Sequence, residues 1–138
     1  MSGDVRRSQD REGPLRLQRR LPGDVDAPGT ARALVQEILV ELNGQVGSRR
    51  DDVILAVSEL VSNAVLHGPP GEVGLDVEVD GTRVRIEVRD SGTDEFGWPR
   101  AFGNGGHWGL SLVQRLSDRS GIERDPTNCA WCEIDLDG

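Results

Sequence analysis

Two neighbouring segments alternate apolar and polar residues with the period of a half-buried strand. Apolar side chains occupy every second position from Val73 to Val79, and again from Val84 to Val88. Asp80 and Gly81, which lie between the two segments, favour a tight turn between antiparallel strands. The pattern therefore predicts a β-hairpin, and a weaker alternation from Leu15 to Leu21 predicts a first strand at an edge of the sheet.

Apolar residues at helical spacing predict two long helices before this hairpin. The first begins at about Asp26, with a proline that is tolerated in its first turn, and extends to Leu42. The second extends from Asp51, whose carboxylate suits the positive end of a helix, to His67. Gly68 and the two prolines that follow it end this helix.

The segment after the hairpin combines glycines with large apolar side chains. Residues 92–109 include six glycines, interleaved with phenylalanine and tryptophan, and such a composition is typical of a lid. A third helix is predicted from about Trp108 to Asp118, followed by short strands near residues 121–124 and 129–136. This order of elements predicts an α+β fold, a two-layer sandwich with helices on one face of a mixed, mostly antiparallel sheet.

The length of 138 residues is typical of one domain. The first 20 residues hold six arginines and three acidic residues but few large apolar ones. We therefore expect a flexible basic tail over residues 1–14 and a single domain over residues 15–138. No apolar run approaches the roughly 20 residues that cross a bilayer, and the N-terminus lacks the apolar core of a secretory signal. A cytoplasmic protein without a membrane partner is the resulting expectation.

Charge excludes several classes of function. The 24 acidic and 16 basic residues give a net charge of -8, which argues against a protein that binds nucleic acid by neutralising phosphates. All of the basic residues are arginine, so the phosphate-binding lysine of a P-loop and a Schiff-base lysine are both excluded.

Cys129 and Cys132 have C-x-x-C spacing, but a strand directs them to opposite faces, which favours core packing over zinc or redox chemistry.

A helical wheel of the second helix places Glu59 and Asn63 among apolar neighbours. Leu55 and Leu66 lie on one side of them and Ala56 lies on the other, so the helix is apolar nearly all round. Such a helix is normally buried, and a buried carboxylate needs a partner. Glu59 and Asn63 are therefore expected to face a ligand, a metal or a wet cavity, although a position facing water at the sheet edge stays open.

Two further features could carry chemistry. Asp90 ends the second strand of the hairpin, where the chain turns sharply, and either presents a carboxylate to a ligand or stabilises a turn. Gly105, Gly106 and Gly109 precede and open a helix that contains Leu110. Backbone amides exposed in such a segment attract phosphate, and a plain glycine-rich linker is the alternative.

Taken in order, these segments resemble the nucleotide-binding domain shared by gyrase, Hsp90, histidine kinases and MutL. Residues 59–64, Glu-Leu-Val-Ser-Asn-Ala, with the His-Gly at 67–68, resemble the N box of that family. Residues 90–92 resemble its first glycine box, and residues 106–113 resemble its second. The short domain with a late tryptophan, Trp131, is most similar to the anti-sigma factor serine kinases of that superfamily.

The resemblance implies the Bergerat fold, the two-layer sandwich of histidine-kinase-like ATPases, with ATP or ADP and Mg²⁺ as cofactors. It implies that Asn63 binds the Mg²⁺ and that Glu59 orients or deprotonates the attacking hydroxyl. Asp90 would accept a hydrogen bond from the adenine amino group, and Gly92 would let the base come close. The phosphates would meet backbone amides at Gly105, Gly106, Gly109 and Leu110, beneath a lid that ends near residue 105.

Two segments depart from the family pattern. Asp94 stands where a second glycine is usual, and Thr127, Asn128 and Cys129 replace the usual Gly and Thr before the last strand, so Thr127 is the expected substitute. Arg100 is the only basic side chain in the lid and could meet a phosphate, with a solvated loop arginine as the alternative.

The function implied by the resemblance is that of an anti-sigma factor and serine kinase. Such a protein phosphorylates an anti-anti-sigma partner, which is a STAS-domain protein, and also sequesters a sigma factor. Homodimerisation is a further expectation from the family. The alternative is a catalytically weak or inactive nucleotide-binding module that regulates transcription by protein sequestration alone.

Overall fold

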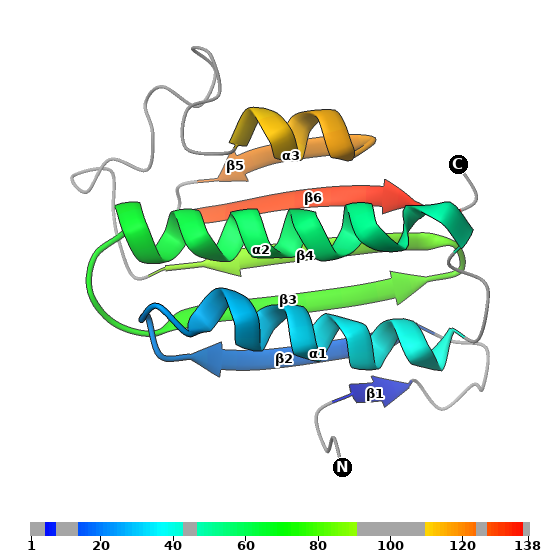
Figure 1. Ribbon diagram of the computed structural model, residues 1–138, viewed down its shortest axis with the longest axis horizontal. Coiled ribbons are helices and arrows are strands. Elements are labelled where there is room, and N and C mark those ends of the chain that lie inside the picture. The colour runs from blue at the N-terminus through cyan, green and yellow to red at the C-terminus, as the bar shows by residue number, and fades with distance from the viewer. Residues whose placement is uncertain (1–4, 8–13, 43–46, 91–109, 124–126, 137–138) are drawn as a thin grey trace.

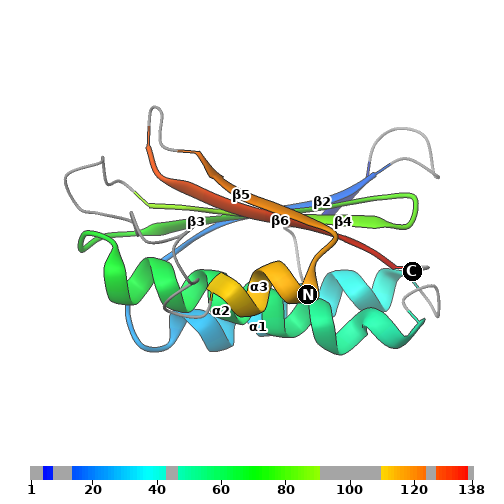
Figure 2. The same ribbon diagram turned by 90° about the horizontal axis from the view of Figure 1, so that it is seen from above.

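The computed structural model describes residues 5–7, 14–42, 47–90, 110–123 and 127–136. Six strands form one sheet in the order β1-β2-β3-β4-β6-β5, and three α-helices cover one of its faces (Figures 1 and 2). This arrangement confirms the two-layer α+β sandwich expected from the sequence. Each pairing among the described strands is antiparallel, so a mixed sheet is not found in this part of the chain.

The hairpin predicted from the alternation is the centre of the sheet. Strand β3 (Val73–Asp80) pairs with β4 (Arg83–Arg89), and Gly81 supplies the positive φ of 63° that the turn requires. Strand β2 (Leu15–Leu21) pairs with β3, and β6 (Cys129–Asp135) pairs with β4. Strand β5 (Arg119–Glu123) forms one edge beside β6.

The other edge differs from the sequence-based expectation. Residues Val5–Arg7, which we expected in a flexible tail, form the short strand β1 and pair with residues 15–17 of β2. Strand β2 therefore lies second in the sheet instead of at its edge. The pairing uses backbone hydrogen bonds, which do not depend on an apolar side-chain pattern.

The three helices follow the predicted spacing closely. Helix α1 comprises Ala27–Glu41, and α2 comprises Arg50–His67 after a short 3-10 turn, η1 (Gly47–Arg49). Helix α3 comprises Leu110–Leu116, so its end comes two residues before the predicted one. The backbone N–H of Asp118 instead donates to the Glu133 carbonyl at 2.8 Å, which draws the chain into the sheet.

The core lies between the sheet and helices α1 and α2, and it is built from the faces that the periodicity identified. Every second residue of β3 and β4 is buried against the helices. The side chains with no exposed surface include Val35 and Ile38 of α1, Val57 of α2, and Val77 and Ile86 of the sheet. Burial of these apolar faces is the main stabilisation of the two-layer arrangement.

The opposite face of the sheet is covered by no described helix and is crossed by ion pairs (Figure 2). Arg85 on β4 contacts Glu87 at 2.7 Å and Glu133 on β6 at 3.0 Å, and its guanidinium lies 4.4 Å from the centre of the Trp131 ring. Arg119 on β5 contacts Glu133 at 2.6 Å. Glu133 therefore joins three adjacent strands through two guanidinium groups.

Replacing Glu133 by glutamine should lower the free energy of unfolding by about 1 kcal/mol at pH 7, since the half-exposed partners weaken the ion pairs. The hydrogen bond from Arg119 holds the pKa of Glu133 below its ordinary value of 4.5. A lowered pKa stabilises the folded state above the ordinary value, and this contribution is lost as the pH falls through the folded pKa. The difference between wild type and Glu133→Gln in urea unfolding should therefore shrink below a pH of about 4.5.

Glu123→Gln is the matched control, because Glu123 is an exposed residue at the end of β5. An equal loss of stability in both variants at pH 7 would contradict the conclusion that the ion pairs of Glu133 stabilise the sheet. A Glu133→Gln effect that persists at pH 3 would also contradict it.

Candidate functional site

The segments that carry the predicted motifs come together toward one end of the molecule. The carboxyl end of α2, the end of β4 and the beginnings of β6 and α3 all lie toward the left in Figure 1. Helix α2 packs against both β4 and α3, so these elements adjoin one another. Residues that are distant in the sequence are thus gathered on one side of the sandwich.

Asn63 is the most deeply buried polar residue of α2, with 3% of its surface exposed. Its amide Nδ2 donates to the backbone carbonyl of Glu59, one turn earlier, at 2.7 Å. Because a backbone carbonyl of the helix accepts a hydrogen bond from this nitrogen, the other amide atom, Oδ1, is the one that can bind another group. An amide oxygen is a ligand that Mg²⁺ accepts, so the residue fits the metal-binding role expected from its position.

Glu59 lies on a less buried part of the same helix than the wheel suggested. Its side chain is half-buried, while Leu55 and Leu66 are 40% and 73% exposed. The expectation that α2 is buried nearly all round is therefore wrong along this stripe. Glu59 lies at the margin between the core and the surface, where its carboxylate can contact solvent.

Asp90 is buried, with 5% of its surface exposed, and the sheet holds it in place. The last regular pair of β4 and β6 is Arg89 with Cys129, and one more backbone hydrogen bond follows, from the Asp90 N–H to the Asn128 carbonyl at 3.1 Å. The Asn128 amide also donates to Asp90 Oδ1 at 3.4 Å. The backbone of Asp90 thus continues the strand pairing.

Gly68 brings the end of α2 against the Asp90 carboxylate. A β-carbon added at Gly68 would lie 2.6 Å from Asp90 Oδ2 and 2.6 Å from the Ala64 carbonyl oxygen. Both distances are far below van der Waals contact, so only glycine fits between the helix and the carboxylate. Gly68 therefore permits the close approach of α2 to the end of β4, besides ending the helix.

Asn128 is the residue of this site that the sequence analysis missed. It is fully buried, yet it lies beside Thr127, which was the expected substitute for the family's glycine and threonine. Thr127 is half-buried, and the contact with Asp90 is made by Asn128 instead. Pairing β4 with β6 in the antiparallel register would have placed residue 128 opposite residue 90, so the register is the signal that could have found it.

Several predicted site residues lie outside the described part of the chain. These residues are Gly92, Asp94, Arg100, Gly105, Gly106 and Gly109. Leu110 is the first residue of α3, the helix that packs against α2. His67, the last residue of α2, is half-buried, and burial lowers the pKa of its imidazole.

A groove of about 660 Å³ lies apart from Glu59 and Asn63. It is lined by residues of β2, β3 and β4 together with Glu72, and Asp90 contributes to its end. Its side chains carry both charges, and Arg89 contacts Glu87 at 3.1 Å within it. Neither Glu59 nor Asn63 lines this groove, so it is not the site predicted from the two residues of α2.

Comparison with known families decides how these features should be interpreted. Residues 21–132, which include Glu59, Asn63 and Asp90, match the model of a family described as the histidine kinase-like ATPase domain. The chain belongs to this family. Membership in a family of ATPase domains implies that the protein binds ATP.

One solved structure similar to this ATPase domain is the crystal structure of the RsbU and RsbW domains of Rv1364c from Mycobacterium tuberculosis. The TM-score is 0.69 and the sequence identity is 27%, over 88% of this chain and 32% of that one. The present chain thus spans about a third of the length of the chain in that structure. No curated protein gives a match.

Among the helices that the structure describes, none has the length and apolar character that crossing a bilayer requires. Within the same described residues, no group of three or more histidine, cysteine or acidic side chains is arranged to hold a metal ion.

The two cysteines of the ATPase domain are separate buried thiols. Both are free and buried, and Cys132 belongs to the main apolar core. Burial raises the pKa of Cys129 to about 11 and that of Cys132 to about 12. A thiol with such a pKa is almost wholly protonated at neutral pH, which agrees with the expectation of core packing.

Both thiols should therefore react slowly with a disulfide reagent such as DTNB. At pH 8 we expect labelling of the native protein to be on the order of a hundredfold slower than labelling in 6 M guanidinium, because raised pKa values reduce the thiolate. The release of the coloured thiol product gives the rate and the number of reacting groups. Rapid labelling of two thiols in the native protein would contradict their burial.

Gly68→Ala should destabilise the domain by about 1–3 kcal/mol, because the new methyl group overlaps the Asp90 carboxylate and the Ala64 carbonyl. Urea unfolding followed by circular dichroism gives the free energy. Gly74→Ala is the matched control, since a β-carbon there would lie 3.8 Å from its nearest neighbour, the Arg89 β-carbon. Equal free energies for the two variants would show that the end of α2 does not depend on the absence of a side chain at residue 68.

Proposed function

We propose that this ATPase domain is an anti-sigma factor and serine kinase that phosphorylates an anti-anti-sigma partner of the STAS type and sequesters a sigma factor. The observation that carries the proposal is the close approach at Gly68 between the end of α2, the helix that bears Glu59 and Asn63, and the Asp90 carboxylate at the end of β4. The similarity to a chain that contains a domain named RsbW supports the choice of kinase type. A cytoplasmic location and a homodimer are parts of the same proposal.

Adenine recognition is assigned to Asp90. Its carboxylate is fixed by Asn128 on one side and packed against Gly68 on the other. A carboxylate held in one orientation can accept a hydrogen bond from the exocyclic amino group of adenine and discriminates against bases without that donor. Gly92 would allow the base to approach, as the resemblance implies.

The Mg²⁺ that accompanies ATP is assigned to Asn63. When bound, the ion would neutralise charge on the phosphates. The hydrogen bond from Nδ2 to the Glu59 carbonyl leaves Oδ1 as the amide atom that would bind the ion. Backbone amides at Gly105, Gly106, Gly109 and Leu110, with Arg100 and Thr127, complete the proposed phosphate contacts.

Glu59 is assigned to the acceptor serine. Its half-buried carboxylate, one turn from Asn63, can accept the hydroxyl proton as the serine oxygen forms a bond to the γ-phosphorus. The bond from the γ-phosphorus to the bridging oxygen breaks at the same time, and ADP leaves with its electron pair. The products are phosphoserine on the partner, ADP and a proton.

A nucleotide-binding interaction module without kinase turnover is the second candidate function. The replacement of a glycine by Asp94 and the substitution at Thr127 favour it, because both alter segments assigned to the lid and the phosphates. In this case the protein would bind nucleotide and partners but would not transfer phosphate.

Calorimetric titration with ADP tests whether the protein binds nucleotide and whether Asn63 carries the effect of Mg²⁺. We expect ADP to bind more tightly with Mg²⁺ than without it, and Asn63→Ala to remove most of that difference while ADP alone still binds. Gln36→Ala is the control, since Gln36 is an exposed amide on α1. Absence of heat at millimolar ADP in wild type would contradict the ATP site, and an unchanged Mg²⁺ effect in Asn63→Ala would contradict the assignment of Asn63.

Phosphoserine formation on a purified STAS-domain partner distinguishes the two candidate functions. With Mg-ATP, wild type should transfer phosphate, and Glu59→Gln should lower the rate by about 10²–10⁴-fold with little change in ADP affinity. Glu37→Gln, which alters an exposed carboxylate on α1, should match wild type. Tight binding of the partner without transfer by wild type would favour the interaction module.

A further inference from the structure

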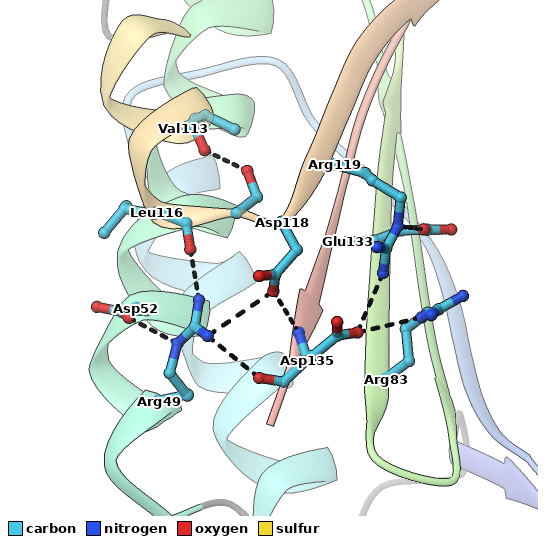
Figure 3. A network of polar contacts seen from close by, with 10 residues as sticks. Arg49, Asp52, Arg83, Val113, Leu116, Asp118, Arg119, Glu133 and Asp135 are labelled. Atoms are coloured by element: carbon cyan, nitrogen blue, oxygen red, sulfur yellow. Dashed lines mark hydrogen bonds and ion pairs between the residues drawn. The ribbon is translucent and has the colours of Figure 1, made fainter. Parts of the chain in front are cut away.

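Arg49 joins three elements at the end of the molecule opposite the candidate site (Figure 3). Its Nη2 donates to the carbonyl of Leu116, the last residue of α3, at 2.7 Å. Its Nη1 donates to the carbonyl of Asp135 at the end of β6, at 3.2 Å. Its Nε contacts the Asp52 carboxylate in the first turn of α2 at 2.9 Å.

The acidic side chains around Arg49 fix its guanidinium in this position. Asp118 Oδ2 lies 3.7 Å from Nη1 and also accepts the Asp135 backbone N–H at 2.8 Å. The Arg49 side chain is only 20% exposed. A guanidinium has several donors in a fixed plane, so it can hold two carbonyls and a carboxylate at once, whereas an ammonium cannot match that geometry.

Helix α3 depends on such contacts because it is short. Its seven residues extend about 10 Å, and an isolated helix of this length is not stable in water. Val113 anchors its middle in the core, where it is 1% exposed. The last carbonyls of a helix have no partner within the helix, and Arg49 supplies both a hydrogen bond and a favourable positive charge at this end.

The other ion pairs nearby do not reach α3. Arg83 contacts the Asp135 carboxylate at 3.2 Å, and Arg119 contacts it at 3.1 Å, so both act between strands (Figure 3). Of the guanidinium groups shown there, Arg49 is the one that contacts a carbonyl of α3. This difference supplies a control within the same network.

We propose that Arg49 is a positioning residue for nucleotide: by fixing the end of α3 to the beginning of α2, it sets where the beginning of α3 lies relative to Asn63. This inference rests on the proposed function, which assigns the backbone of Leu110 to the phosphates. Helix α3 has only seven residues and packs against α2, so freeing its last turn from Arg49 also loosens the position of its first turn. Loss of the Arg49 contacts therefore weakens nucleotide binding from the opposite end of the molecule.

Hydrogen exchange and calorimetry on Arg49→Lys and Arg49→Ala test the inference. Without nucleotide, the amides of residues 113–118 should exchange at least about tenfold faster in both variants than in wild type, while those of the β3–β4 hairpin keep their protection. The Kd for Mg-ADP should rise by roughly fivefold or more. Arg83→Ala should leave both quantities as in wild type. Arg49→Lys keeps the positive charge, so it remains informative if Arg49→Ala does not fold.

The outcomes separate this inference from the proposed function. Faster exchange of α3 with an unchanged Kd would show a purely structural role and overturn the inference, as would unchanged exchange in Arg49→Lys. The same losses in Arg83→Ala would also overturn it. Absence of Mg-ADP binding by wild type would overturn the proposed function and the inference together, whereas an equal Kd for wild type and Arg49→Lys would overturn the inference alone.

Discussion

The candidate site depends on one backbone hydrogen bond, from the Asp90 N–H to the Asn128 carbonyl. This bond continues the β4–β6 pairing one residue beyond the regular ladder and fixes Asp90 beneath the end of α2. A buried carboxylate is costly unless other groups compensate it, and the Asn128 amide supplies part of that compensation. Gly68 then lets α2 approach the carboxylate, so the position of the helix relative to the sheet follows from the same constraint.

The position of Asn63 follows from the position of α2 relative to the sheet. It lies five residues before Gly68 on the same rigid helix, and its side chain is held by the Glu59 carbonyl. The Arg32 guanidinium of α1 donates to the Ser58 hydroxyl at 2.7 Å, which ties the opposite side of α2 to its neighbour. The helix is thus fixed by apolar packing below and by polar contacts at its side and end. Pre-organisation of this kind suits a site that must orient phosphates.

The sequence alone predicted the elements whose residues face one core. The β3–β4 hairpin and helices α1 and α2 were predicted nearly to the residue because their apolar periods are regular. Strand β1 was not, because its pairing with β2 rests on backbone groups that leave no side-chain pattern. The helical wheel also failed to predict that Leu66 is exposed. A wheel shows which residues share one side of a helix, but it does not show which side the neighbouring elements cover.

The contacts that complete the site could not be predicted for a different reason. Asn128 and Asp90 lie 38 residues apart, and Arg49 and Leu116 lie 67 residues apart. Hydrogen bonds over such separations follow from strand register and helix packing, which a single sequence does not express. The motifs therefore identified Glu59, Asn63 and Asp90 as candidate site residues. The contacts made by Asn128, Gly68 and Arg49 became visible only in the structure.

Helix α2 extends from one end of the sandwich to the other, and the shorter α3 lies beside it. Arg49 immediately precedes α2 and holds the carbonyl of Leu116 at the end of α3, while Glu59 and Asn63 lie farther along α2 and Leu110 begins α3. The separation between the two helices at the site is thus constrained at their far end. Coupling between binding and such a contact is reciprocal in free energy. If the Arg49 contacts strengthen nucleotide binding, bound nucleotide must strengthen the Arg49 contacts by the same amount, and the far end of the sandwich then reports whether the site is occupied.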